Sequence, residues 1–265
     1  MARKALVTGA RGTVGSALCA HLTARGHQVV AWPRDRIAPW DVAAMAPYLR
    51  GAAPDLAFHL AIASRSTGTD HEGWRVNVEW AGALAGMCGE LDIPFIFTST
   101  AMVFSDQARG PFTRQASPDA REGYGYEKRM AEALVRDKNP AARIVRLGWQ
   151  IGTAPGSNNM IDYLAARMTE HGEVRASTAW LPATSFLDDT AAVLADVVER
   201  PPGLYMIDSN RGWSFYDIAC ALNQQHGEPW TITATDDFVY DQRLLDDDLD
   251  VPSLATRLPQ LPALA

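Results

Sequence analysis

The sequence has no apolar run approaching the roughly 20 residues that a membrane-spanning helix requires. We also expect no secretory signal, because the first four residues lead directly into a strand-like segment that ends at a glycine. Cysteine is scarce: Cys19, Cys88 and Cys220 stand alone, with neither metal-ligand spacing nor the even number typical of a disulfide framework. We therefore expect a cytoplasmic protein with reduced thiols and no metal site.

Positive charge is also in deficit. The 24 Lys and Arg residues are outnumbered by 31 Asp and Glu residues, so the formal net charge is −7. Such a surface repels the phosphates of nucleic acids and anionic lipids, which argues against either as a partner. The chain is long and apolar enough to form one large core, since it has 265 residues of which 47% are hydrophobic. We expect a small-molecule partner, and the choice between a monomer and a homodimer stays open.

Short apolar runs alternate with amphipathic stretches along most of the chain. Helical stretches are expected at 14–25, 72–90 and 124–135. The strand-like runs are 4–8, 28–32, 55–60, 94–98, 142–147 and 204–207. Uniformly apolar strands that alternate with helices are typical of a parallel sheet covered on both faces. The sequence therefore predicts an α/β fold with a Rossmann-type doubly wound parallel sheet and a small C-terminal lobe.

The pattern changes after Trp149. Residues 152–159 have the composition of a loop, a helix is expected at 160–171, and an irregular stretch continues to Thr184. We expect an NAD(P)-binding Rossmann domain over residues 1–150, to which residues 186–212 return. The expected substrate-binding lobe comprises residues 151–185 and 213–265. The acidic run from Asp246 to Asp250 is interpreted as a solvated surface turn.

A glycine-rich turn follows the first strand-like run. It reads VTGARGTVGSAL, with Gly9, Gly12 and Gly15 spaced three residues apart. Gly9 allows the tight turn, Gly12 lets the backbone approach a pyrophosphate, and Gly15 lets the next helix pack closely on the sheet. The start of that helix offers free N–H groups and a favourable dipole to an anion. The dinucleotide contacts predicted in this loop are Gly9, Arg11, Gly12, Thr13 and Val14.

The residues after the second strand-like run bear on the choice between NAD and NADP. An NAD enzyme normally places a carboxylate there for the adenosine ribose, whereas an arginine there can pair with the 2′-phosphate of NADP. This chain has Arg34 and Arg36 on either side of Asp35. Arg11 in the glycine loop points the same way, so we favour NADP(H) over NAD(H), with Asp35 as the counter-argument.

A possible acid/base pair lies in the segment Tyr124-Gly-Tyr-Glu-Lys128. Positions i and i+4 share a helix face, so Tyr124 and Lys128 project together. An ammonium beside a phenol favours the phenolate, so we expect Lys128 to lower the pKa of Tyr124 from its usual value of about 10. Tyr126 lies only two residues before the lysine and faces elsewhere. Thr98 ends the fourth strand-like run and Thr100 follows it, which places their hydroxyls at the edge of the sheet where ligands bind.

Taken together, these motifs resemble the extended short-chain dehydrogenase/reductases, whose glycines have this three-residue spacing and whose Ser/Thr precedes the tyrosine as Thr100 precedes Tyr124. The closer resemblance is to the dTDP-4-dehydrorhamnose reductase family and covers most of the chain. STAMVF at 99–104 is similar to that family's STDYVF, and RLGWQIG at 146–152 to its RTSWVYG. Further matches are Pro-Phe-Thr at 111–113, Asn159-Met160 and Pro182-Ala183-Thr184.

The resemblance implies roles for residues that spacing alone does not mark. Asp41-Val42 is similar to the pair that contacts adenine, and the backbone of 60–63 corresponds to a segment that lies along the cofactor. His59 in this segment is expected to be a packed histidine without a chemical role, and Asn77 is expected to brace the region of the fourth strand. The implied cofactor contacts beyond the glycine loop are Arg34, Asp41, Val42, Leu60, Ala61, Ala63, Asn77, Thr98, Tyr124, Lys128 and Leu147.

The implied substrate contacts are Thr100, Met102, Trp149 and Asn159. The Asp-Tyr of the family motif is replaced by Ala101-Met102, so the resemblance implies a retained catalytic set and an altered substrate side.

The function that the resemblance implies is NADP(H)-dependent reduction of a keto group, with a nucleotide-activated dTDP-4-keto sugar as the expected substrate. The catalytic residues would be Thr100, Tyr124 and Lys128, with Tyr124 as the general acid. One alternative is a nucleotide-sugar epimerase with tightly bound NAD. Another is a non-catalytic, NADP-sensing regulatory subunit.

Overall fold

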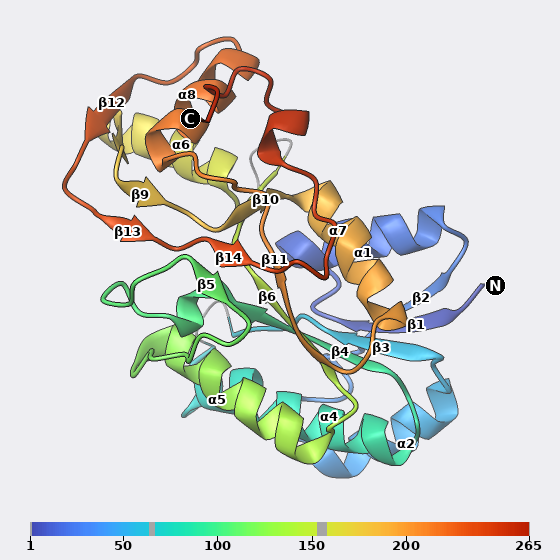
Figure 1. Cartoon of the computed structure of the whole chain (residues 1–265). Helices are drawn as coiled ribbons and strands as arrows, with labels where there is room; N and C mark the ends of the chain where they lie inside the picture. The colour runs from blue at the N-terminus through green and yellow to red at the C-terminus, as the bar shows by residue number, and fades with distance from the viewer. Residues whose placement is uncertain (1, 64–66, 153–157, 265) are drawn as a thin grey trace.

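The computed structural model describes residues 2–63, 67–152 and 158–264, and it has a central parallel sheet with helices on both faces (Figure 1). The strand order across the sheet is β11-β6-β4-β3-β1-β2. The strands are β1 (Lys4–Thr8), β2 (Gln28–Ala31), β3 (Leu56–His59), β4 (Phe95–Thr100), β6 (Arg143–Leu147) and β11 (Gly203–Ile207). All five pairings are parallel. The predicted Rossmann-type α/β fold is therefore confirmed.

Two layers of helices cover the sheet. On one face lie α2 (Val42–Ala52), α4 (Trp80–Glu90) and α5 (Gly123–Lys138), and on the other lie α1 (Thr13–Ala24) and α7 (Leu187–Asp196). Each layer encloses its own apolar cluster, one around Trp80 and Phe95 and one around Leu18 and Phe58. The strands contribute side chains to both clusters, which is why they read as uniformly apolar runs.

Two helical features depart from the sequence patterns. The predicted helix at 72–90 is three consecutive pieces: α3 (Glu72–Trp74), a π-helical turn η1 (Arg75–Glu79) and α4. A π-turn inside an α-helix is uncommon and often lies at a functional site. Helix α2 was not predicted, since Pro47 lies inside it and proline normally argues against a helix interior.

A second, smaller group of elements lies beyond the carboxyl ends of the main strands (Figure 1). It contains α6 (Met160–His171) and α8 (Phe215–Gln225), packed around a separate apolar cluster that includes Leu164 and Ile218. Its strands are β7 (Trp149–Ile151), β8 (Val174–Ser177), β9 (Trp180–Leu181), β10 (Thr184–Phe186), β12 (Ile232–Thr235) and β13 (Tyr240–Asp241). The prediction of an irregular stretch before Thr184 is wrong, because β8 and β9 lie in it. They pair with β12 and β13, about 60 residues later, so no local pattern marks them. The loop expected at 152–159 falls mostly on residues 153–157, outside the described residues.

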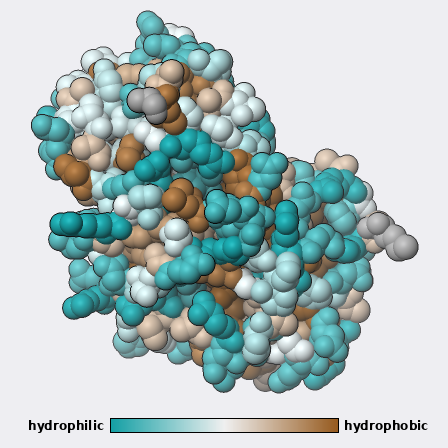
Figure 2. All heavy atoms as spheres, in the orientation of Figure 1, coloured by the Kyte–Doolittle hydropathy of each residue, from teal (hydrophilic) through white to brown (hydrophobic). Residues whose placement is uncertain are grey.

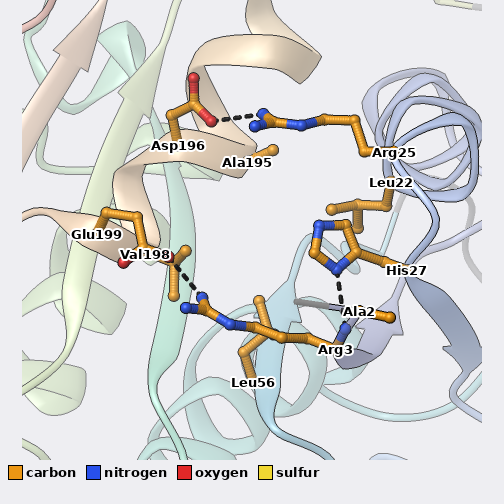
Figure 3. A pocket seen from close by; sticks show the side chains of 10 residues that line it. All are labelled: Ala2, Arg3, Leu22, Arg25, His27, Leu56, Ala195, Asp196, Val198 and Glu199. Atoms are coloured by element: carbon orange, nitrogen blue, oxygen red, sulfur yellow. Dashed lines mark hydrogen bonds and ion pairs between the residues drawn. The ribbon is translucent and has the colours of Figure 1, made fainter.

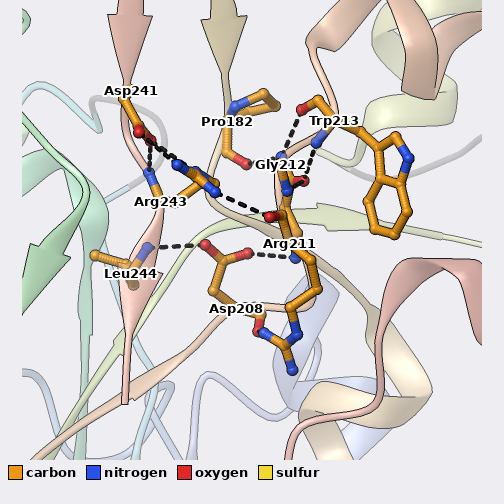
Figure 4. Close-up of polar contacts among 9 residues, drawn as sticks. Pro182, Asp208, Arg211, Gly212, Trp213, Asp241, Arg243 and Leu244 are labelled. Carbon is orange, nitrogen blue, oxygen red and sulfur yellow. Dashed lines mark hydrogen bonds and ion pairs between the residues drawn. The ribbon is translucent and has the colours of Figure 1, made fainter. Parts of the chain in front are cut away.

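Asp208 and Asn210 attach this second group to the main sheet, and Figure 4 shows the Asp208 carboxylate bonded to the N–H group of Leu244. The Asp208 carboxylate accepts hydrogen bonds from the backbone N–H groups of Thr184 (3.0 Å), Asn210 (2.8 Å) and Leu244 (2.8 Å). Burial raises the pKa of Asp208 to about 7, and the three N–H donors oppose that shift. The Asn210 amide donates to the carbonyls of Pro182 (2.9 Å) and Trp213 (2.8 Å). A single turn after β11 thus holds two distant segments in place, one at 182–184 and one at Leu244.

The acidic run after β14 (Leu244–Leu245) is only partly the solvated turn that the sequence suggested. The side chain of Asp246 is 1% exposed, accepts a hydrogen bond from the Met206 N–H (2.9 Å) and lies 3.5 Å from the Arg114 Nε. Asp247, Asp248 and Asp250 are exposed, as expected. The interpretation was wrong for Asp246, because its burial depends on partners far away in the chain.

The surface is mainly hydrophilic on the face seen in Figure 2, with apolar residues in scattered patches. No helix within residues 2–63, 67–152 and 158–264 has both the length and the apolar character needed to cross a bilayer. A hollow of about 420 Å³ lies at the amino ends of the strands, between α1 and the end of α7 (Figure 3). Ion pairs cross it, from Arg25 to Asp196 and from Arg3 to Glu199, each at 2.6 Å. It is opposite the edge where ligands of Rossmann-type sheets bind.

Candidate active site

The turn after β1 has the backbone that its glycines predict. Gly9 has a φ of +69°, and the Gly12 N–H donates to the Gly9 carbonyl (2.9 Å) just before α1 begins at Thr13. A side chain at Gly9 would lie 2.8 Å from the backbone of the segment after β3, and a side chain at Gly15 would overlap the Gly9 carbonyl oxygen. Both positions therefore need glycine for reasons of space, and Gly9 also for its conformation.

The N-terminus of α1 fits a pyrophosphate. Its N-cap, Gly12, provides no capping side chain, and the first turn holds no acidic residue. The N–H groups of Thr13 and Val14 lie in this first turn, where no intrahelical acceptor exists. Their dipoles favour an anion, and Arg11 is exposed beside them. These residues could hold the phosphates of a dinucleotide.

The segment after β3 is positioned by the hydroxyl of Thr8, which no sequence motif had singled out. Thr8 Oγ1 accepts hydrogen bonds from the N–H groups of Leu60 (3.1 Å) and Ala61 (3.2 Å) and lies 2.9 Å from His59 Nδ1. Burial lowers the pKa of His59 to about 3, and the nearby Lys128 acts in the same direction. His59 is therefore a neutral packed histidine at neutral pH. Thr98 donates its hydroxyl hydrogen to the His59 carbonyl (3.2 Å), which joins β4 to this segment.

Asn77 links two segments other than the one expected. From the π-turn η1, its Oδ1 accepts from the Ala63 N–H (3.0 Å), and its Nδ2 donates to Glu127 (2.7 Å). Asn77 thus braces the segment after β3 against α5, and the prediction that it braces the region of β4 is corrected. Glu127, between Tyr124 and Lys128, was not predicted as part of the site. Its role depends on the packing of η1 against α5, which has no sequence signature.

The three predicted catalytic residues come from elements that pack together at the carboxyl edge of the sheet. Thr100 ends β4, and its Oγ1 accepts from the Met102 N–H (3.2 Å) in the short helix η2 (Ala101–Val103). Tyr124 and Lys128 lie in the first turns of α5, which packs against both β4 and η2. A side chain at Gly125 would overlap the Met102 carbonyl, so glycine allows the close approach of α5 to η2. The structure thus brings the end of β4 at Thr100 and the turns of α5 that hold Tyr124 and Lys128 to one edge of the sheet.

Burial dominates the electrostatics of this pair. The Lys128 side chain is buried, with Nζ 4.0 Å from the centre of the Phe97 ring. Burial lowers the pKa of Lys128 to about 7, although the carboxylates of Glu132 and Glu127 oppose this. Burial also raises the pKa of Tyr124 to about 12, and Glu127 adds to that rise. The expectation that Lys128 lowers the pKa of Tyr124 is therefore wrong for this structure. At neutral pH the phenol is protonated, which is the form of a general acid.

A buried ion pair anchors this face of α5. Glu132 follows Lys128 by one turn, and its carboxylate accepts two hydrogen bonds from Arg146 on β6, from Nε (2.9 Å) and from NH2 (2.7 Å). The two side chains are 4% and 2% exposed. Bidentate pairing of a guanidinium with a carboxylate fixes orientation as well as distance. The pair therefore sets how α5 lies on the sheet, and with it the positions of Tyr124 and Lys128.

The predicted substrate residues lie in two surroundings. Met102 is half exposed beside α5. Trp149 begins β7, two residues after Leu147, and Leu147 pairs with Thr100 across β6 and β4. The Trp149 ring stacks on Trp180 at 6.0 Å. Asn159 is buried as the N-cap of α6, where its Oδ1 accepts from the Ile161 N–H (2.8 Å). Its proposed contact with substrate stays a prediction.

The predicted adenosine side of the site lies after β2. Arg34 is exposed, and its NH2 group lies 3.5 Å from Oε1 of Glu72. Asp41 caps α2 by accepting from the Ala44 N–H (3.2 Å), and Val42 is half exposed. Nothing in the spacing of the sequence had marked Glu72. It comes from the segment after β3, whose path to Arg34 only the fold reveals.

The pKa of Lys128 predicts a stability effect with a definite pH dependence. Below about pH 7 Lys128 is charged in both states, and the full cost of burying its charge lowers the free energy of unfolding. Between about pH 7 and 10 only the unfolded chain keeps the Lys128 side chain protonated, so the free energy of unfolding rises with pH and this cost disappears. Each unit of pKa depression costs about 1.4 kcal/mol. Allowing for relaxation around the charge, we expect Lys128→Met to be about 2 kcal/mol more stable at pH 6.

Urea unfolding of both proteins from pH 6 to 9 tests this, because the difference should narrow as the pH rises. The exposed Lys138→Met in the last turn of α5 is the matched control. A Lys128→Met protein that is less stable than the wild type at pH 6 would contradict the burial argument.

Comparison with known proteins adds to this geometry. The family model described as the RmlD substrate binding domain matches residues 3–240. The spore coat polysaccharide biosynthesis protein SpsK of Bacillus subtilis is 24% identical over 227 residues, which cover 84% of this chain and 80% of SpsK. The dTDP-4-dehydrorhamnose reductase of Mycolicibacterium smegmatis is 29% identical over 162 residues, covering 60% of this chain and 49% of that protein.

Among solved structures, a dTDP-4-dehydrorhamnose reductase from Bacillus anthracis, crystallised in complex with NADP, superimposes with a TM-score of 0.82. The match covers 98% of this chain and 99% of that one at 15% sequence identity. At this identity the likeness concerns the fold.

Proposed function

This chain belongs to the RmlD substrate binding domain family, and from that premise we propose that it is an NADP(H)-dependent oxidoreductase that reduces a keto group of a nucleotide-activated sugar. The observation that carries the proposal is the arrangement at the end of β4, where α5 places Tyr124 and Lys128 beside the segment that begins at Thr100. The glycine turn after β1 lies at the same edge of the sheet.

The proposed cofactor site uses the residues at the carboxyl ends of the first strands. The N–H groups of Thr13 and Val14 would donate to the pyrophosphate, with Gly9 and Gly12 allowing its approach. The backbone of 60–63 would lie along the dinucleotide, and Asp41-Val42 would contact the adenine. Arg11 and Arg34 would pair with a 2′-phosphate. When bound, the reduced nicotinamide supplies a hydride to the carbonyl carbon.

The chain's own residues supply the remaining steps. The Thr100 hydroxyl would orient the carbonyl oxygen of the substrate, and the Tyr124 phenol would donate its proton to that oxygen as the alcohol forms. A pKa of about 12 keeps the phenol protonated at neutral pH until that transfer. The ammonium group of Lys128 would hold the nicotinamide ribose by donating hydrogen bonds to its hydroxyls. Solvent returns the proton to Tyr124 after each turnover.

We also propose that the chain is divided by function as the sequence suggested. Residues 1–150 and 186–212 would bind the cofactor, and residues 151–185 and 213–265 would bind the substrate. The separate apolar cluster around α6 and α8 supports this division. Met102 and Trp149 would face the sugar. Since Ala101-Met102 offers no carboxylate or phenol, the sugar would be held with fewer hydrogen bonds there.

The test is oxidation of NADPH or NADH by the purified protein, followed by absorbance, with dTDP-4-dehydrorhamnose and other nucleotide 4-keto sugars as substrates. We expect turnover that depends on substrate, and a loss of about tenfold or more in kcat/KM for Thr100→Val, since the hydroxyl that orients the carbonyl is removed. NAD released only on denaturing the protein would instead favour an epimerase. Binding of NADPH without turnover of any keto sugar would favour a regulatory subunit.

A further inference from the structure

A carboxylate lies beside the arginine that the proposed function assigns to the NADP phosphate. Glu72 Oε1 is 3.5 Å from NH2 of Arg34, and the Glu72 side chain is 5% exposed whereas that of Arg34 is 41% exposed. The two residues come from different crossovers of the sheet, after β3 and after β2. Their contact is thus a product of the fold rather than of neighbouring sequence.

The hydrogen bonds of Glu72 leave one oxygen available. Oε2 accepts from the N–H (2.7 Å) and the hydroxyl (2.9 Å) of Thr67. These bonds lower the pKa of Glu72, so the carboxylate is charged at neutral pH. Oε1 is buried and accepts no hydrogen bond from the described residues. A buried charged oxygen with unused acceptor capacity calls for a donor, and the Arg34 contact at 3.5 Å is too long to be a full hydrogen bond.

A second contact places Glu72 at the same edge. The guanidinium of Arg75, one turn after Glu72, lies 4.5 Å from the centre of the Trp40 ring, just before α2. Two contacts therefore join the segment after β2 to the segment after β3. This is where Rossmann-type domains bind the adenosine ribose, with a carboxylate in NAD enzymes and an arginine in NADP enzymes. This chain has both groups, but the acid is supplied from the crossover after β3.

We propose that Glu72 is the residue that limits the preference of this site for NADP(H) over NAD(H). Its carboxylate competes with a 2′-phosphate for Arg34 and repels that phosphate, while Oε1 accepts a hydrogen bond from a ribose hydroxyl of NAD(H). The inference rests on the proposed dinucleotide site and goes further, since it names the residue opposing Arg34. Selectivity is then set by a pair of opposite charges, not by Arg34 alone.

The test is the ratio of the dissociation constants of NAD(H) and NADP(H), measured by calorimetry on the whole 265-residue chain. Glu72→Gln keeps an oxygen for Thr67 and removes the charge. We expect it to shift the ratio towards NADP(H) by about tenfold. Asp70→Asn is the matched control, because it removes an equal charge from an exposed position two residues away. Thermal unfolding without ligand verifies that each variant is folded.

A double-mutant cycle tests whether Glu72 acts through Arg34. In an Arg34→Ala background, the gain in NADP(H) affinity from Glu72→Gln should be clearly smaller, because only the direct repulsion between Glu72 and the 2′-phosphate is left to relieve. The inference is overturned if folded Glu72→Gln binds both dinucleotides with an unchanged ratio, if Asp70→Asn shifts the ratio equally, or if the effect is the same without Arg34. Failure of the proposed function would give a different result. The wild type would then either bind neither dinucleotide or bind one without reducing any keto sugar.

Discussion

A Tyr124→Phe protein is expected to lose about 10²–10⁴-fold in the rate of keto-sugar reduction while it still binds NADPH. The substitution removes one oxygen and keeps the aromatic ring at the start of α5, so the fold should be unchanged. The rate should fall because the carbonyl oxygen no longer receives a proton from a positioned donor. Single-turnover kinetics with bound NADPH would separate this loss from any change in binding.

Tyr126→Phe is the matched control for this prediction. Tyr126 lies in the same turn of α5 but packs its ring near Trp74, 6.3 Å between centres, so the loss of its hydroxyl should leave the rate within about twofold. A Tyr124→Phe protein with near wild-type turnover would show that the proton comes from elsewhere. Equal losses in both variants would indicate a general disturbance of α5 instead of lost acid catalysis.

The largest stability effect is expected from breaking the Glu132–Arg146 pair. Glu132→Leu leaves the Arg146 guanidinium buried without its carboxylate, and removal of one partner from a buried pair typically costs about 3–5 kcal/mol. Urea unfolding, followed by circular dichroism, would measure the loss. Because the pair sets how α5 lies on β6, we expect the variant to lose reductase activity as well, even where it is fully folded.

Two further proteins make this prediction specific. Replacing both partners, as Glu132→Leu with Arg146→Met, should recover much of the stability, since the guanidinium of Arg146 is then no longer buried without its carboxylate. Arg167→Met breaks an exposed ion pair with Glu170 on α6 and should cost no more than about 1 kcal/mol. If Glu132→Leu cost as little as the exposed control, the pair would not be an anchor of α5.

The local patterns of the chain predicted most of the main sheet, and the departures have physical causes. Apolar runs found all six strands. The four inner strands are largely buried, and a strand buried on both faces must be apolar along its length, whereas the edge strand β2 is only partly buried. Helix α2 was missed because Pro47 normally argues against a helix interior. Strands β8 and β9 were missed since each pairs with residues about 60 positions later. Asp246 was placed in solvent for the same reason, as its partners Met206 and Arg114 are distant.

The sequence by itself determined the parts of the candidate site whose geometry is local. The turn at Gly9 and the shared face of Tyr124 and Lys128 follow from a few consecutive residues, since backbone conformation and helical spacing depend on near neighbours. The tertiary structure decided everything that depends on burial and on distant partners. Burial reversed the expected pKa shift of Tyr124, and the crossover after β3 brought Glu72 to Arg34. Desolvation and charge pairing act between groups that are close in space, and spacing along the chain does not encode them.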